Sequence, residues 1–169
     1  MKRKQRIIYG ALLILWMIVI WGFSAVPGEA SMEMSGCFAG PLARFLQQCV
    51  MGDADESARL AMIAVSQFLI RKGAHFVEYA VLGALFYLFG GTFSIRPLGL
   101  WAAIASFACA CADELHQLIS GTRSGLIRDV VWDTVGAAAG ILLIWIVLSL
   151  LALRKLRKQQ NAAPQTRKE

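Results

Sequence analysis

Charged residues are scarce in this chain. They make up 17% of its 169 residues, against 57% apolar residues. Apolar content this high argues against a small soluble domain. Histidine occurs twice, none of the four cysteines forms a Cys-x-x-Cys pair, and there are no internal repeats or low-complexity tracts. A zinc ribbon is therefore excluded, and the fold has to be inferred from the apolar residues.

The apolar residues are gathered into four long blocks. A helix rises 1.5 Å per residue, so about 20 residues cross the hydrocarbon core of a bilayer. The first and last blocks have about that length, whereas the middle two reach it only with their polar-edged ends. We therefore predict an all-α, integral membrane four-helix bundle in contact with the lipid bilayer, with spans at about residues 7–23, 74–89, 98–115 and 130–153.

The first loop, residues 24–70, contains a further helical pattern. Asp53 and Glu56 have the spacing of a capping box, and apolar residues recur at helical intervals from Leu60 to Ile70. Because this stretch is too short to span, we predict a short helix lying in the outer membrane interface. The alternative is that it continues the second spanning helix outward.

The distribution of lysine and arginine predicts the topology. Eleven cations and one acid lie in the N-terminal tail (residues 1–6), the C-terminal tail (residues 154–169) and the loop between spans two and three. Six cations and ten acids lie on the other side. The positive-inside rule then places both termini in the cytoplasm, with a membrane domain over residues 7–153 between two basic tails. The net charge of +6 is accounted for by topology, and no nucleic-acid partner is expected.

Two features of the first half leave alternatives open. Gly28-Glu29-Ala30 resembles a signal-peptidase site, but the preceding apolar run is longer than the usual 7–15 or so residues of a signal peptide. We therefore favour an uncleaved anchor. Cys37 and Cys49 lie in the outer loop and would form a disulfide only in an oxidising compartment, whereas Cys109 and Cys111 are expected to be small packing residues.

Polar clusters stand at the ends of the last three spans. An ionised group in the bilayer centre costs at least about 2.5–3.5 kcal/mol, so a dozen polar groups at such positions indicate a function. Residues three and four apart share a helix face, which predicts one polar stripe on each helix and one pocket that opens outward. The candidate binding residues are Arg71, Lys72, His75, Glu78, Tyr79, Asp113, Glu114, His116, Gln117, Arg123, Arg128, Asp129 and Asp133.

Several uses of this pocket remain open from the residues alone. His75, Glu78, Glu114 and His116 are candidate ligands of a divalent metal, although no known metal motif is matched and no cofactor is established. The same four are candidate catalytic residues, because acids and histidines in one site perturb each other's proton affinity. Arg123 and Arg128 suit a phosphate or carboxylate on an envelope ligand bound without catalysis.

Two structural interpretations are also open. The charged groups can pair with each other and join the helix ends. Gly136 and Gly140 form a Gly-xxx-Gly step that allows close helix packing, including self-association.

Three stretches of these clusters resemble the VanZ-like family of bacterial membrane proteins. They are Arg71-Lys72-Gly73-Ala74-His75-Phe76-Val77-Glu78-Tyr79, Asp113-Glu114-Leu115-His116-Gln117, and Arg123-Ser124 to Arg128-Asp129 with Asp133-Thr134-Val135-Gly136. The resemblance runs from the first span through the fourth. It implies a multi-pass protein of the bacterial cytoplasmic membrane that modulates susceptibility to glycopeptide antibiotics such as teicoplanin. It does not imply a catalytic role, so a hydrolase or transferase acting on a lipid-linked envelope substrate, or a structural partner in an envelope complex, remain as alternatives.

Overall fold

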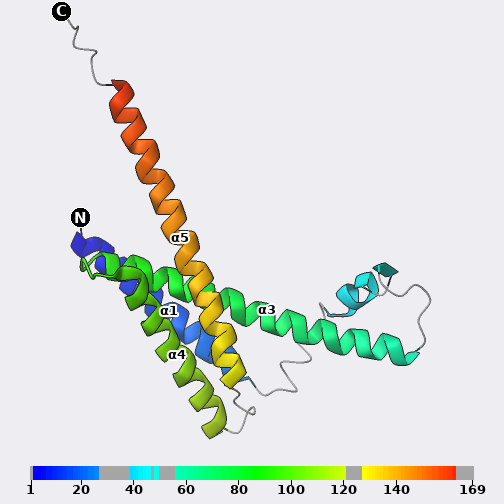
Figure 1. The fold of residues 1–169 in the computed structure, drawn as a ribbon. Helices are drawn as coiled ribbons and strands as arrows, with labels where there is room; N and C mark the ends of the chain where they lie inside the picture. Colours follow the sequence, from blue (N-terminus) through cyan, green and yellow to red (C-terminus); the bar gives the residue numbers. More distant parts are fainter. Residues whose placement is uncertain (1, 27–38, 47, 50–55, 121–126, 163–169) are drawn as a thin grey trace, which may run out of the picture.

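Four long helices make up most of the molecule (Figure 1). The structure, a computed structural model, describes residues 2–26, 39–46, 48–49, 56–120 and 127–162. Over these residues the long helices are α1 (Lys2–Ser24), α3 (Glu56–Gly91), α4 (Leu98–Ser120) and α5 (Ile127–Ala162), and each is long and apolar enough to cross a membrane. The described part is all-α, as the sequence predicts.

The helices pack around a small core, and most of their large apolar side chains face outward. Many leucines, isoleucines and valines along α1 and α5 are exposed, for example Ile14 at 61% and Leu143 at 64%. An exposed apolar surface of this extent is expected where lipid is the solvent. The described core instead contains alanine at close helix contacts together with a few larger residues: Leu13, Ile20, Tyr79, Leu82, Phe86, Ala102, Ala110, Ala137 and Ile141.

The closest helix contact is the crossing of α3 and α5. A β-carbon on Gly136 would lie 2.6 Å from the Phe76 carbonyl oxygen, and one on Gly140 would overlap the Ala80 carbonyl. A β-carbon on Gly83 would in turn overlap the Ala137 carbonyl. The Gly136–Gly140 step is therefore covered by α3 of the same chain. The step is therefore not free on the described surface, and self-association through it stays a prediction.

The segment from Leu60 to Ile70 is not a separate interfacial helix. It belongs to α3, which runs without a break from Glu56 to Gly91, so our first prediction for this segment is wrong and the alternative holds. The reason is local, because no proline interrupts the pattern and Gly73 is tolerated inside a helix at a cost of about 1 kcal/mol. The short helix that does occur in this loop covers residues 39–46, and Asp53 lies outside the described residues.

The start of α1 is attached to the turn between α3 and α4. Arg6 donates from Nη2 to the Thr92 carbonyl at 3.1 Å, and its guanidinium lies 4.3 Å from the centre of the Phe93 ring. Further along, Leu13 and Ile20 of α1 contribute to the core. α1 is thus joined to the bundle at its start and along its length, and the uncleaved anchor stays a prediction.

Candidate functional site

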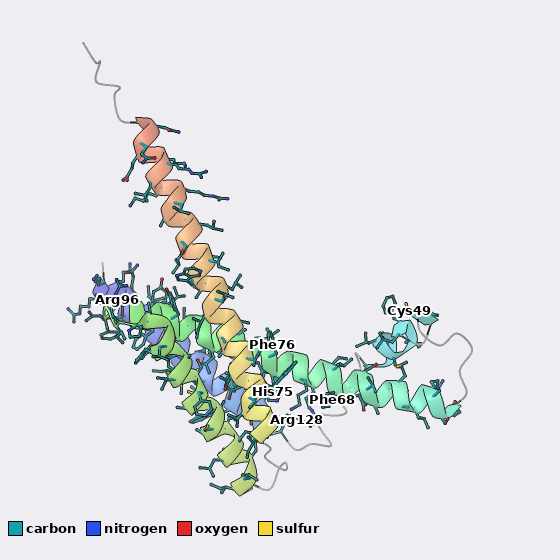
Figure 2. All side chains as sticks on the ribbon, viewed as in Figure 1. Cys49, Phe68, His75, Phe76, Arg96 and Arg128 are labelled. Atoms are coloured by element: carbon teal, nitrogen blue, oxygen red, sulfur yellow. The ribbon has the colours of Figure 1, made fainter. Side chains whose placement is uncertain are left out.

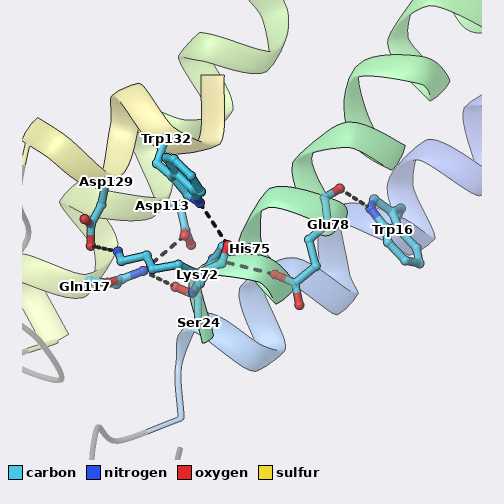
Figure 3. Close-up of polar contacts among 9 residues, drawn as sticks. All are labelled: Trp16, Ser24, Lys72, His75, Glu78, Asp113, Gln117, Asp129 and Trp132. Atoms are coloured by element: carbon cyan, nitrogen blue, oxygen red, sulfur yellow. Dashed lines mark hydrogen bonds and ion pairs between the residues drawn. The ribbon is translucent and has the colours of Figure 1, made fainter. Parts of the chain in front are cut away.

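The polar stripe of α3 is formed as the sequence predicts. Tyr79 is 1% exposed, and His75 Nδ1 lies 3.6 Å from Glu78 Oε2, one turn along the same face. The Glu78 carbonyl also accepts a hydrogen bond at 2.9 Å from Nε1 of Trp16 on α1. Trp16, which the sequence did not single out as a site residue, therefore fixes α1 against this stripe (Figure 3).

Toward the end of α4 the buried polar residues are Asp113, Glu114 and Gln117. Asp113 has no exposed surface, and Glu114 and Gln117 are 7% and 3% exposed. Gln117 donates from Nε2 to Ser24 Oγ at 2.6 Å and to Asp113 Oδ2 at 3.1 Å (Figure 3). Because Ser24 is the last residue of α1, this amide joins the ends of α1 and α4 beside the site. Ser106 and Ala110 continue the buried face deeper into the bundle.

His116 does not belong to this face. Its side chain is exposed, although the sequence prediction grouped it with Asp113 and Gln117. A helix turns about 100° per residue, so Asp113, Glu114 and Gln117 together define a face from which His116 is turned by more than 90°. The prediction used the spacing from Asp113 alone and therefore placed the stripe too far toward His116.

The start of α5 supplies the third group of polar side chains. Asp133 is 3% exposed, and Asp129 Oδ2 lies 2.6 Å from Lys72 Nζ, an ion pair that joins α5 to α3. Trp132 donates from Nε1 to the Lys72 carbonyl at 2.9 Å, and its ring lies 5.8 Å from that of Phe76. Trp132 therefore binds α3 through both its polar and its apolar parts.

The three stripes meet in one acidic cluster. The Asp133 carboxylate interacts electrostatically with Asp113, Glu114, Asp129 and Lys72, and Tyr79 interacts with Asp113, Glu114 and Asp133. Carboxylates from α4 and α5 thus surround a tyrosine from α3, with Lys72 as the partly buried cation of the group. Arg71 is half-buried on α3, Arg128 is exposed, and Arg123 lies outside the described residues.

A pocket of about 320 Å³ lies beside this cluster, between α3 and α5. Its charged members are Lys72, Arg128 and Asp129, and its apolar walls are Phe68, Leu69 and Trp132, with Gly73 between them. The apolar members were not predicted as site residues. They can be found only once α3 is known to continue past Gly73, because that continuity brings Phe68 beside Trp132 of α5.

Metal coordination finds no support in the arrangement of these side chains. Among the described residues, no three His, Cys, Asp or Glu side chains converge in a way that could hold a metal ion. Exposure of His116 removes one of the four candidate ligands from the cluster. Cys49 is an exposed free thiol, and its predicted partner Cys37 lies outside the described residues.

Comparison with known proteins identifies a family. The model of the VanZ/LLP1 family matches residues 9–149, which contain all of α3 and α4, most of α1 and α5, and every residue of the cluster. No curated protein and no solved structure matches the chain.

Proposed function

The chain belongs to the VanZ/LLP1 family, and we propose that it binds an amphiphilic component of the bacterial cell envelope at the polar site between α3, α4 and α5. One observation carries the proposal. The pocket between α3 and α5 is lined by apolar side chains together with Lys72, Arg128 and Asp129, and it adjoins buried carboxylates of α4 and α5. A small-molecule site is usually an apolar cleft in which a few polar groups recognise the ligand.

The distribution of charge supports an outward-facing site. All the described acids, from Glu56 to Asp133, lie at the end of the bundle that holds the pocket or on the part of α3 beyond it. Arg6 and Arg96 lie at the opposite end, where the first basic tail meets the turn between α3 and α4. By the positive-inside rule we place both termini in the cytoplasm of the bacterial cell and the pocket at the outer face of its cytoplasmic membrane.

The lining residues define the chemistry of the ligand. Lys72 and Arg128 suit an anionic group, because lysine and arginine both bind phosphate and carboxylate oxygens. Phe68 and Trp132 supply apolar surface for a hydrocarbon part of the ligand. The buried carboxylates behind them accept hydrogen bonds from hydroxyl or ammonium groups. A lipid-linked envelope component carries such features together.

Occupation of this site would change how amphiphilic antibiotics bind at the membrane. Measuring the susceptibility of a host to teicoplanin tests this proposal. A susceptible host expressing the wild-type chain is expected to tolerate more teicoplanin than the same host without it. Glu114→Gln and Arg128→Gln should abolish the difference, because one alters the buried acids and the other the pocket cation. Arg157→Gln is the matched control, since Arg157 is exposed near the end of α5.

Protein levels are compared by immunoblot in every strain. If Glu114→Gln and Arg128→Gln retain wild-type tolerance at equal protein level, the pocket does not act in this way. If all three variants lose tolerance equally, the loss comes from neutralising any charged residue of the protein and does not depend on the site.

Catalysis on a lipid-linked envelope substrate is a second candidate, favoured by the burial of Asp113, Glu114 and Asp133 in one cluster. Buried carboxylates at mutual electrostatic range are typical of acid–base sites. Purified protein incubated with the lipid extract of its host would then change the mass spectrum of that extract, and Glu114→Gln would not. An unchanged spectrum with the wild-type protein leaves binding without turnover as the activity.

A further inference from the structure

The end of the bundle away from the polar site contains a second, larger groove. It has a volume of about 810 Å³ and lies where the α3–α4 turn and the start of α4 face α5. Small residues create the space, since Gly99, Ala103 and Ala138 leave room that larger side chains would fill. Even a β-carbon on Gly99 would come no closer than 4.0 Å to another side chain. The lining residues are Tyr87, Arg96, Pro97, Leu98, Gly99, Ala103, Ala138, Ile141, Leu142 and Trp145.

The groove is apolar along its length and cationic at one end. Arg96 is the charged residue of its lining, and the groove continues from there along Leu98, Ile141 and Leu142. Figure 2 shows Arg96 at the far end of the bundle from His75 and Arg128. The groove therefore shares no residue with the polar site.

Among the residues that the structure describes, no acid forms an ion pair with Arg96. The sequence contains no Asp or Glu from residue 80 to 112 or from 134 to 162. Arg6 of α1 lies nearby, bonded to the Thr92 carbonyl of the same turn. The first turn of α4 adds unpaired backbone N–H groups, which carry a partial positive charge.

From this arrangement we propose that the groove binds an anionic phospholipid of the surrounding bilayer, with an acyl chain along α4 and α5 and its phosphate at Arg96. Three observations agree on this occupant. Leu142 is an exposed apolar residue of a helix long and apolar enough to cross a membrane, Arg96 makes one end of the groove cationic, and Trp145 and Tyr87 supply aromatic surface on the walls. Basic pockets between transmembrane helices are established binding sites for anionic lipid headgroups.

Charge complementarity distinguishes this occupant from a zwitterionic lipid. A zwitterionic headgroup would bring a cation close to Arg96 and to the start of α4, where no described acid can receive it. Phosphatidylglycerol carries the phosphate without that cation. One lysine or arginine at a membrane surface contributes enough attraction to change affinity about fivefold.

The test is quenching of tryptophan fluorescence in full-length protein in mixed micelles, titrated with dibrominated phosphatidylglycerol or dibrominated phosphatidylcholine. Brominated chains quench a tryptophan they contact, so Trp145 serves as the reporter, and Trp145→Phe identifies its part of the signal. We expect quenching of Trp145 at lower mole fractions of phosphatidylglycerol than of phosphatidylcholine. Arg96→Gln should reduce that preference for phosphatidylglycerol about fivefold.

Arg154→Gln is the matched control, because it removes one cation from the same end of the molecule at a position outside the groove. Ala138→Leu is a second variant, which fills the groove without touching Arg96. Ala138 is exposed, so this change is expected to leave the fold intact, and it should weaken quenching by both lipids.

Three results would overturn the proposal. Equal quenching by the two lipids in the wild-type protein would show that the groove does not select an anionic headgroup. Equal loss in Arg96→Gln and Arg154→Gln would assign the preference to the overall charge of this end. Unchanged quenching in Ala138→Leu would show that the lipid contacts Trp145 from outside the groove. None of these results depends on what binds at the polar site.

Discussion

At the scale of single residues, Gln117 joins two helices beside the site. Its amide nitrogen donates to Ser24 on α1 and to Asp113 on its own helix, and all three side chains are buried. A buried acceptor that loses its donor costs about 1–3 kcal/mol. Gln117→Leu is therefore expected to lower the free energy of unfolding by about that amount, measured by denaturant titration in mixed micelles.

Gln159→Leu is the control for this change. It makes the same substitution at an exposed position near the end of α5, where an effect within about 0.5 kcal/mol is expected. Equal losses for the two variants would show that the Gln117 hydrogen bonds do not stabilise the fold.

The burial of several polar residues could be predicted from the sequence, but the boundary of the cluster could not. Tyr79, Asp113, Gln117 and Asp133 are buried as their helical spacing predicts. His116 stands three residues after Asp113, a spacing that also predicts a shared face, yet it is exposed. The position of the buried face depends on where neighbouring helices pack and not on spacing alone. Phe68 and Trp132 show the same limit, since only tertiary contact makes them neighbours in one pocket.

At the scale of helices, the crossing of α3 and α5 depends on residues without large side chains. A β-carbon at Gly140 would overlap the Ala80 carbonyl, so even alanine requires the two backbones to separate. Overpacking of this kind costs about 1–3 kcal/mol. We expect Gly140→Ala to be destabilising by at least that amount, with the loss measured by denaturant titration.

Gly73→Ala provides the matched control within α3. A β-carbon there meets no other atom within 4 Å, and alanine in a helix interior is more favourable than glycine by about 1 kcal/mol. The two substitutions should therefore have opposite signs. A stabilising Gly140→Ala would mean that the helices cross less closely than described.

The continuity of α3 gives a second prediction at this scale. Leu60 and Val77 are both exposed on α3, seventeen residues apart, so an unbroken helix places their α-carbons about 25 Å apart. Spin labels at Leu60→Cys and Val77→Cys, with the native cysteines replaced by serine, should give one narrow distance distribution near that value. A short or broad distribution would indicate a bend near Gly73.

The sequence prediction ended the second spanning helix near Gly73, because a membrane span needs only about 20 residues. The helix observed, α3, has 36. Span length limits how much of a helix lies in lipid but not how far it extends beyond. Once a helix has formed, each added residue gains a backbone hydrogen bond without a new nucleation cost. A single glycine is too weak a signal to end it.

At the scale of the whole molecule, the two ends of the bundle differ in charge and in the kind of cavity they hold. The acidic cluster and its pocket lie at one end, and Arg96 and the larger apolar groove lie at the other (Figure 2). This polarity could be predicted from charge counts, because eleven of the seventeen lysines and arginines but only one of the eleven acids fall in the two tails and the loop between spans two and three. The groove could not, since it arises from small residues on two helices that only packing brings together.

Opposite ends of one bundle have to face opposite sides of the membrane, which makes the orientation testable with two thiols. Cys49 is an exposed native cysteine beside the N-terminal half of α3 (Figure 2), and Ser94→Cys would place a second thiol in the exposed turn between α3 and α4. In intact cells, a membrane-impermeant maleimide should label Cys49 but not Ser94→Cys. Each thiol is tested in a chain whose other cysteines are serine.

Permeabilised cells provide the internal control, since both thiols should then react. Labelling of Ser94→Cys but not of Cys49 in intact cells would show that the topology is the inverse of the one proposed. The polar site would then face the cytoplasm, and an envelope ligand on the outer surface could not reach it. Because the side with the excess of lysine and arginine is the cytoplasmic one by the positive-inside rule, we expect the orientation with Cys49 outside.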